Sequence, residues 1–239
     1  MKKLLLSFLF FSIATGAVLA QKTINDPNAE KRTIGSFHGI DVGTGIQLIL
    51  TPGTTEEVAV SASKTEFRDK IVSKVENGVL KLYYDDKLGS INKNKEKKDL
   101  KAYVSYKNLD KLNANTGARV ELEGTLESSS LKINANTGAT VNGKVKSNEM
   151  EVEQSTGSVI TLSGDAEKLD VEGDTGSRFK GTDLSTGVCN AKVNTGATIA
   201  VTANKELSAK ADTGGRVTYK GDAALKEVKK STGGSVSKI

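Results

Sequence analysis

Four carboxylates recur at matched positions, nineteen residues apart, and could together hold a metal ion. They are Glu151, Glu153, Asp170 and Glu172. Oxygen ligands suit a hard cation such as Ca²⁺, so this group is a weak candidate calcium site, although the calcium-binding repeat GGxGxD is absent. Like charges opposite each other destabilise a sheet. The simpler interpretation is that Lys132 and Lys192, in the neighbouring repeats, neutralise the cluster.

Six basic residues form a second candidate site, for an acidic ligand. They are Arg119, Arg178, Arg216, Lys144, Lys180 and Lys220. The three arginines each stand three residues after a recurring threonine, so they share one position of the repeat. Such a surface suits an acidic polysaccharide or lipopolysaccharide. The alternative is that these charges keep a flat sheet soluble.

The chain has few of the residues that nucleophilic catalysis or zinc binding requires. Cys189 is the only cysteine, which excludes an internal disulfide, and His38 is the only histidine. A catalytic triad or a four-ligand zinc site has little to build on. Cys189 also occupies a repeat position that is otherwise filled by apolar residues such as Leu169 and Leu207. We therefore expect it to be buried, and we expect no cofactor.

A repeated phrase dictates how these residues are positioned. A polar residue followed by Thr, Gly, a small residue, any residue and an apolar residue occurs seven times. The threonines, 18 to 21 residues apart, are Thr116, Thr137, Thr156, Thr175, Thr195, Thr213 and Thr232. A period near 20 residues indicates a solenoid, in which each coil buries its apolar side against its neighbours.

Aligning the seven repeats on their threonines predicts which residues of each coil point inward and where the chain turns. The fourth residue after the threonine is always apolar. The fourth residue before it is also apolar, as in Ile133, Val152 and Val171, and its sequence neighbours are mostly polar, which is the alternation of a half-buried strand. The second residue after it is always Ala, Ser or Gly, and the Thr-Gly step has turn chemistry in which Gly takes φ > 0. The fold class is therefore all-β, with a β-solenoid of about seven coils over residues 110–239.

The first half of the chain has other features. Residues 1–20 have a basic start, an apolar run and small residues before Ala20, as in a secretory signal peptide. Residues 21–32 are expected to be flexible, and residues 33–109 to form a β-rich domain with an Asn-Gly hairpin at Glu76–Val79. Thr65–Lys70 suggests one helical turn, and the charged run Asp85–Lys101 a solvated loop. No second apolar run is long enough for a transmembrane helix.

Three features together resemble a known family. They are FHGIDVGTGIQLILTPG at Phe37–Gly53, VENGVLKLYY at Val75–Tyr84, and the succession of polar-Thr-Gly-small phrases. In these the chain resembles the auto-transporter adhesin, head GIN domain proteins of Bacteroidota. The resemblance implies a β-solenoid-like fold in the cell envelope. Thr stands here where that family more often has Ser.

Two function hypotheses follow. The first is a non-enzymatic secreted or envelope protein that presents a repetitive β surface to a glycan or protein partner; the second is a polysaccharide hydrolase or lyase on a β-helix scaffold. Without Lys2 and Lys3 the net charge falls from +5 to +3, which is too small to suggest nucleic acid. Export leads to the periplasm, the outer surface or the medium. Lys226 and Lys230 at inward positions of the last repeat predict a polar cap and a monomer.

Overall fold

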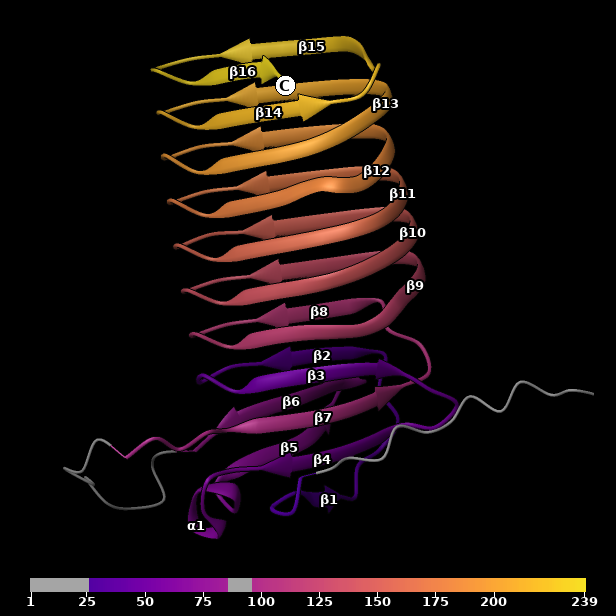
Figure 1. Cartoon of the computed structure of the whole chain (residues 1–239), viewed down its shortest axis with the longest axis vertical. Helices are drawn as coiled ribbons and strands as arrows, with labels where there is room; N and C mark the ends of the chain where they lie inside the picture. Colours follow the sequence, from indigo (N-terminus) through magenta and orange to yellow (C-terminus); the bar gives the residue numbers. More distant parts are fainter. Residues whose placement is uncertain (1–25, 86–95) are drawn as a thin grey trace, which may run out of the picture.

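The computed structural model describes residues 26–85 and 96–239, which form an almost entirely β structure. Figure 1 shows a tall stack of coils standing on a less regular base. The long strands of the stack are β9 (Arg119–Ala135), β10 (Thr140–Gln154), β11 (Val159–Gly173), β12 (Arg178–Val193) and β13 (Thr198–Ala211). The predicted signal peptide, residues 1–20, and most of the charged run Asp85–Lys101 lie outside the described residues.

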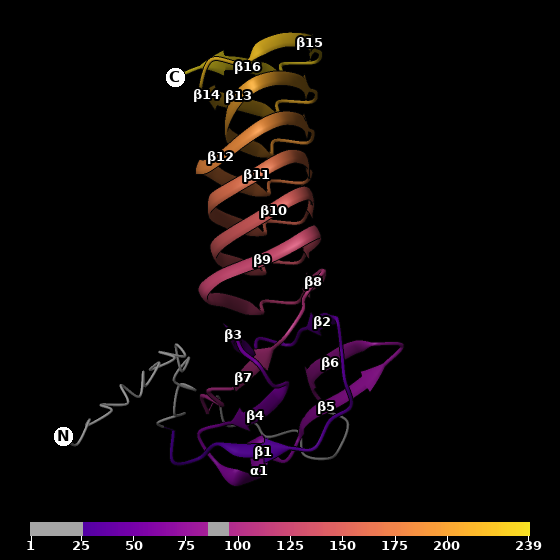
Figure 2. The same ribbon diagram turned by 90° about the vertical axis from the view of Figure 1, so that its right-hand side faces the viewer.

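Each long strand bends around one edge of the stack, so its two halves lie on opposite faces (Figure 2). Neighbouring strands are parallel and in register, with Val120 opposite Val141 and Ile160 opposite Phe179. Val120, Val141, Ile160, Phe179, Ile199 and Val217 are all at most 1% exposed. The predicted β-solenoid of about seven coils is confirmed, and so are its inward positions in all but the last coil, where Val228 is 39% exposed and Val236 only partly buried. Its core is a continuous ladder of apolar side chains.

The Thr-Gly steps form the sharp edge of the stack, at the left of Figure 1. The seven threonines have φ between 43° and 51° and the glycines after them between 69° and 79°. Two consecutive residues with positive φ mark a type I′ turn. Positive φ was predicted for the glycine and is confirmed, whereas the same conformation at threonine, a β-branched residue, is strained and was not foreseen.

Hydrogen bonds hold these corners. Within a turn, Ala118 N donates to Asn115 O (3.0 Å), and between coils Gly117 N donates to Thr137 O (2.9 Å). The inter-coil bond from glycine to the threonine carbonyl of the next coil recurs from Gly45 up to Gly214, at 2.9–3.1 Å. The corner polar groups are therefore satisfied as they are in the flanking ladder.

The unequal lengths of the repeats are absorbed away from these corners. The register shifts between Asn142 and Lys144 and again between Thr161 and Ser163, at the rounded edge where the strands bend. Extra residues are taken up there as bulges. The corners and the inward positions therefore stay aligned although the spacing varies.

The coil pattern begins earlier than the sequence suggested. β2 (Gly39–Val42) pairs in parallel with β8 (Lys111–Ala114), and β3 (Gln47–Pro52) pairs with β9. Thr44 and Gly45 between β2 and β3 have φ of 53° and 73°, so they form one more Thr-Gly corner. The sheet thus runs across the boundary at residue 109, and a division into two domains there remains a prediction.

Below β2 and β3 the two faces diverge and are closed by further strands. The remaining elements of the base are β1 (Glu30–Arg32), β4 (Glu57–Ser61), α1 (Thr65–Arg68), β5 (Ile71–Glu76), β6 (Val79–Tyr84) and β7 (Lys101–Tyr106). The predicted helical turn corresponds to α1, and the predicted Asn-Gly hairpin to the antiparallel pair β5–β6. β1 pairs antiparallel with β4, and this corrects the expectation that residues 21–32 are flexible throughout.

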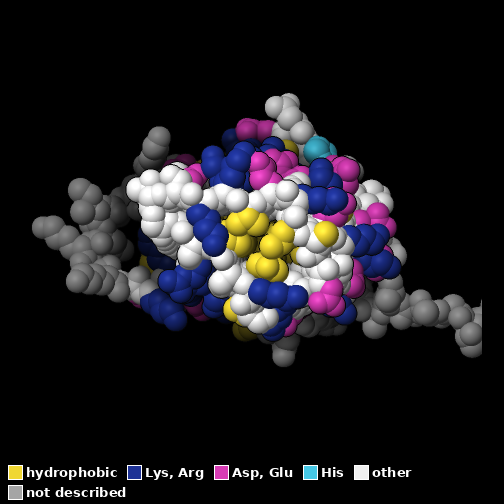
Figure 3. Space-filling model, turned by 90° about the horizontal axis from the view of Figure 1, so that it is seen from above, with side chains coloured by type: hydrophobic (Ala, Val, Ile, Leu, Met, Phe, Trp, Pro, Cys, Tyr) yellow, Lys and Arg dark blue, Asp and Glu magenta, His cyan; other side chains and the backbone are white. Residues whose placement is uncertain are grey.

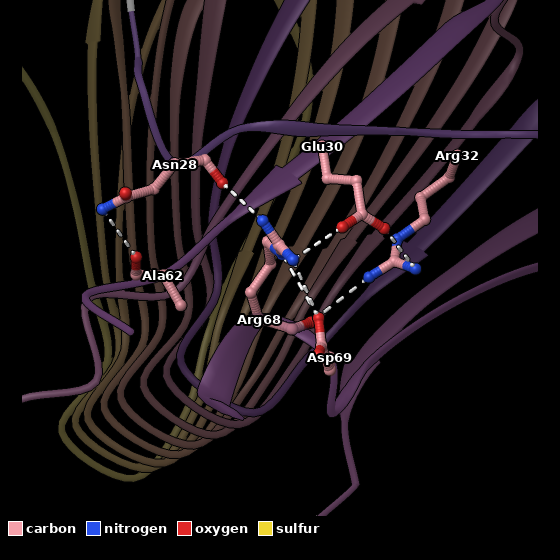
Figure 4. Close-up of polar contacts among 6 residues, drawn as sticks. All are labelled: Asn28, Glu30, Arg32, Ala62, Arg68 and Asp69. Carbon is pink, nitrogen blue, oxygen red and sulfur yellow. Dashed lines mark hydrogen bonds and ion pairs between the residues drawn. The ribbon is translucent and has the colours of Figure 1, made fainter. Parts of the chain in front are cut away.

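An ion-pair network fastens β1 to the base (Figure 4). Glu30 pairs with Arg32 Nη1 at 2.9 Å and with Arg68 Nη2 at 2.7 Å. Arg68 also donates to the main-chain oxygen of Asn28 and to Asp69. The Arg68 side chain is only 19% exposed, and charge-assisted hydrogen bonds of this kind are stronger than neutral ones, so the network helps to hold β1 in place.

The upper end is built from β14 (Arg216–Lys220), β15 (Ala224–Lys230) and β16 (Ser235–Lys238). β15 lies on β13, with Leu225 opposite Leu207, and the register then slips so that Glu227 faces Ser208. Lys226 is left between them and pairs with Glu206 at 3.3 Å. The expectation that Lys226 points inward is therefore wrong, because a bulge places Leu225 there. Lys230 does lie opposite the buried Ala211, as predicted.

Candidate ligand face

The arginine face is the side of the stack formed by the first halves of β9–β13, directly after the corners. Arg119, Arg178 and Arg216 lie in one vertical column there, because Arg119 aligns with Thr140 and Val159, and Arg178 with Thr198 and Arg216. Strands in a sheet are about 4.8 Å apart. The arginines therefore stand about 14 Å and about 10 Å apart along the stack.

The three lysines of the candidate site lie beside this column rather than in it. Lys180 is two residues beyond Arg178, whereas Lys144 aligns with Thr125 and Ser163, and Lys220 with Thr202. All six basic residues are exposed. The three arginines and Lys180 thus lie on the arginine face, whereas Lys144 and Lys220 lie at its border with the rounded edge. The six residues form a loose basic band and not a compact cluster.

These six residues differ from most other cations in their pairing. Within residues 26–85 and 96–239, none of the six makes an ion pair or a side-chain hydrogen bond. The carboxylate of Glu121, nearby on the same face, is occupied by Asn142 Nδ2 at 2.8 Å. The band therefore has unused charge and donors for an acidic ligand.

The opposite side of the stack, formed by the second halves of β9–β13, is here called the ion-pair face. Several of its lysines pair with carboxylates of their own or the adjacent coil, although Lys192 makes no ion pair among the described residues. Lys168 pairs with Asp170 (3.0 Å) and Lys210 with Asp212 (3.3 Å), and in β15, the strand above β13, Lys229 pairs with Glu227 (2.5 Å). The two faces therefore use similar residues in different ways.

The four carboxylates of the calcium hypothesis lie on the ion-pair face. Glu151 aligns with Asp170 and Glu153 with Glu172, as the repeat predicted. Lys132 Nζ lies 2.9 Å from an oxygen of both Glu151 and Glu153, so its predicted neutralising role is confirmed. No group of three or more metal-ligating side chains occurs in the part of the chain that the structure describes. The geometry gives the calcium hypothesis no support.

Local bonds favour the ionised form of two of these carboxylates, Glu151 and Asp170. The bond from Lys132 lowers the pKa of Glu151. Burial would raise the pKa of Asp170, but bonds from Asn190 (2.5 Å) and Lys168 outweigh it and the pKa is lowered. Asn190 was not foreseen as a partner, although it stands in the same repeat position as Asp170 one coil later. A groove of about 280 Å³ runs over this group and is lined by both acids and lysines.

Cys189 and His38 take different positions. Cys189 is completely buried, as predicted, and burial with the nearby charge of Asp170 raises the pKa of its thiol to about 12. The thiol is therefore protonated and inaccessible at neutral pH. His38 Nδ1 lies 2.8 Å from Asp110 Oδ1, and both side chains are more than half exposed. This pair could not be predicted from a local sequence pattern, because 72 residues separate its members.

Comparison with known proteins places the chain in a family. The family described as "Putative auto-transporter adhesin, head GIN domain" matches residues 36–223. No curated protein matches. Among the described residues, no helix is long and apolar enough to cross a membrane.

Similar solved structures come from Bacteroides and Parabacteroides. A putative adhesin of Bacteroides fragilis is 17% identical with a TM-score of 0.76, covering 88% of this chain and 96% of its own. A putative adhesin of Parabacteroides merdae is also 17% identical (TM-score 0.69; 88% and 95% covered). A putative lipid binding protein of Parabacteroides distasonis is 19% identical (TM-score 0.64; 90% and 98% covered). They share the fold, and the match over residues 36–223 shows that the chain belongs to the auto-transporter adhesin, head GIN domain family.

Proposed function

We propose that this is a non-enzymatic, exported protein of the cell envelope that binds an acidic glycan along its arginine face. One observation carries the proposal: six exposed cations lie on that face or at its border with the rounded edge, and none has an anionic partner among the described residues. The family description and the names of the similar structures fit an adhesin-like role. The expected ligand is a polymer that carries regularly spaced negative charges.

The rod shape suits such a ligand. Arginines repeated along a straight face meet successive charges of an extended polymer, so that individually weak contacts add through one chain. An exposed ion pair contributes only about 0.2–1 kcal/mol. Binding by this face should therefore need several residues together and weaken steeply with salt.

The alternative of a polysaccharide-cleaving enzyme has less support from the geometry. A glycosidase needs a carboxyl group whose pKa is raised, so that it is protonated and acts as general acid. Glu151 and Asp170, on the ion-pair face, have pKa values lowered by Lys132 and Asn190 instead. They are held as structural anions.

The test compares two triple variants with the same change in charge. Arg119→Gln, Arg178→Gln and Arg216→Gln remove the arginine column, whereas Lys132→Gln, Lys168→Gln and Lys210→Gln remove paired lysines from the ion-pair face. Binding to polygalacturonate, with neutral dextran as control, is measured by biolayer interferometry at several NaCl concentrations. We expect the arginine variant to bind at least about tenfold more weakly and the lysine variant to change about twofold or less.

Either of two results would contradict the proposal. One is equal loss in both triple variants, which would indicate attraction by net charge alone. The other is binding to dextran as tight as to polygalacturonate. Export is tested separately, by finding whether the chain made with residues 1–20 appears in the periplasm or at the cell surface and loses that segment.

A further inference from the structure

The last coil exposes side chains that every lower coil buries. Leu225 (50% exposed), Val228 (39%) and Ile239 (62%) are the exposed large hydrophobic residues of the described chain. By register Leu225 stands above Leu207 and Val228 above Ala209, both of which are buried. Seen from above, this end has a hydrophobic patch near its centre, with basic side chains and some acidic ones around it (Figure 3).

The backbone of this end is also open. Within the described residues β15 pairs only with β13, and β16 only with β14. All seven residues of β15 are exposed. In lower corners a glycine N–H donates to the next coil, up to the bond from Gly214 N to Thr232 O, and Gly233 has no coil above it. The upper edge thus offers a row of donors and acceptors for another strand.

Charge indicates what kind of strand fits. Residues 224–239 contain four lysines and one glutamate. Lys230 occupies an inward position above Ala211, and Lys238 one above Tyr219, so both flank the apolar patch. Lys230 has no ion pair among the described residues, whereas Lys238 Nζ lies 3.5 Å from Asp222 Oδ1, a fully exposed carboxylate for which a partner's carboxylate would be exchanged. The end is therefore apolar at its centre, basic around it, and ready to accept backbone hydrogen bonds.

Two other occupants fit less well. A second copy meeting this end would bring the same lysine-rich strand against it, and like charges across a strand pair are destabilising. A membrane of anionic lipids would match the lysines, but the hydrocarbon would leave the backbone groups of β15 without hydrogen bonds, at a cost of several kcal/mol each. Only an added strand satisfies the apolar, basic and backbone features together.

We propose that the open end is a second binding site, which accepts an extended acidic segment of a partner protein as an additional strand on β15. Apolar residues at alternate positions of that segment cover Leu225 and Val228, and carboxylates between or beside them pair with Lys230 and Lys238. The recognition mode is strand addition, in which main-chain bonds give affinity and alternate side chains give specificity. The site is independent of the arginine face.

A segment of this chain provides a probe with the required chemistry. Residues 149–163, EMEVEQSTGSVITLS, alternate Glu149, Glu151 and Glu153 with Met150 and Val152, which are buried in the native coil. A fluorescent peptide of this sequence is titrated with the whole protein and its anisotropy is followed. We expect saturable binding, and at least about tenfold weaker binding of the same peptide with lysine at its three glutamate positions.

Variants locate the site. Leu225→Ser with Val228→Ser should weaken the acidic peptide about tenfold or more, because the apolar contacts are lost. Both residues are exposed, so folding should be retained, and circular dichroism checks this. Lys230→Glu keeps the apolar patch and should reverse the preference between acidic and lysine-substituted peptides. The arginine-face triple variant should bind the peptide unchanged, which separates this site from the glycan site.

Three results would overturn the proposal. The first is peptide binding that neither the Leu225/Val228 variant nor Lys230→Glu alters. The second is a dimer in sedimentation that Leu225→Ser dissociates, which would make a second copy the occupant. The third is pelleting with vesicles of phosphatidylcholine and phosphatidylserine that requires Leu225 and Val228, in the absence of peptide binding; the occupant would then be a membrane.

Discussion

The interior coils and the last coil follow one repeat pattern but have different environments. Cys189, Leu207 and Leu225 occupy the same column in successive coils, and the first two are completely buried whereas Leu225 is half exposed. The difference lies in the neighbouring coils, because among the described residues no further coil is stacked on the last one. Equivalent residues in a solenoid are therefore not energetically equivalent. The local sequence sets the direction of a side chain, and the stack determines what its burial contributes.

The largest difference should appear in thiol accessibility. Native Cys189 should react with a maleimide or DTNB at least about a thousandfold more slowly than a cysteine placed in the same column of the last coil, by Leu225→Cys in a Cys189→Ala background. Buried Cys189 reacts only after opening of the stack, and opening of about 4 kcal/mol corresponds to that factor. Unfolding in urea should make both thiols equally reactive. Comparable native rates would show that the interior coils open freely.

Truncation of the largest interior side chain should have the next largest effect. Phe179 is 1% exposed, and any side chain at Gly181 would collide with its ring, so the coil is built around it. Phe179→Ala should lower the free energy of unfolding by about 3–5 kcal/mol, measured by urea denaturation. Phe179→Leu is the control and should cost less, because most of the volume remains. A cost below about 1 kcal/mol for the alanine variant would contradict the tight packing.

The same substitution in two coils tests the comparison directly. Leu207→Ala should cost about 2–4 kcal/mol, because it leaves a cavity, and Leu225→Ala less than about 1 kcal/mol, because that side chain is half in water. Both are measured by urea denaturation under identical conditions. Equal costs would mean that the end coil is covered in solution.

The smallest effect concerns association at the last coil. Replacing Lys226, Lys229 and Lys230 with threonine removes the repulsion between two open ends and leaves the edge of β15 exposed. We expect the variant to self-associate with rising concentration in light scattering while the parent stays monomeric. Replacing Lys144, Lys180 and Lys220 in the same way should not promote association. A triple variant as monodisperse as the parent would show that the lysines are not what keeps ends apart.

The sequence predicted the solenoid because each inward position is occupied by one residue type in nearly every coil. Val120, Ile160 and Phe179 can be placed from spacing alone, and so can Cys189. The start of the stack was missed, because at Thr44 the usual polar residue is Gly43 and the usual small residue is Ile46. A corner depends on backbone conformation, which tolerates such exchanges.

The candidate sites were less predictable because pairing depends on register and on unforeseen neighbours. The stacking of Glu151 on Asp170 follows from the period, but the bond from Asn190 to Asp170 depends on side-chain reach. Lys226 could not be placed because one bulge moves a residue from inward to outward. The six basic residues can be recognised as unpaired only when the positions of all nearby carboxylates are known.

The hydrogen bond from glycine to threonine joins each corner to the next, so the stack is built from equivalent coils, each of which adds the same length. Because each corner contacts the coils above and below in the same way, a whole repeat can be removed or duplicated without redesigning its surroundings. Deleting residues 156–174 joins Ser155 to Thr175, restores the Ser-Thr-Gly-Ser phrase, and should shorten the molecule by one spacing of about 4.8 Å. Unequal recombination between repeats in the gene would do the same, so descendants of this chain can vary in height while the base and the open end stay constant.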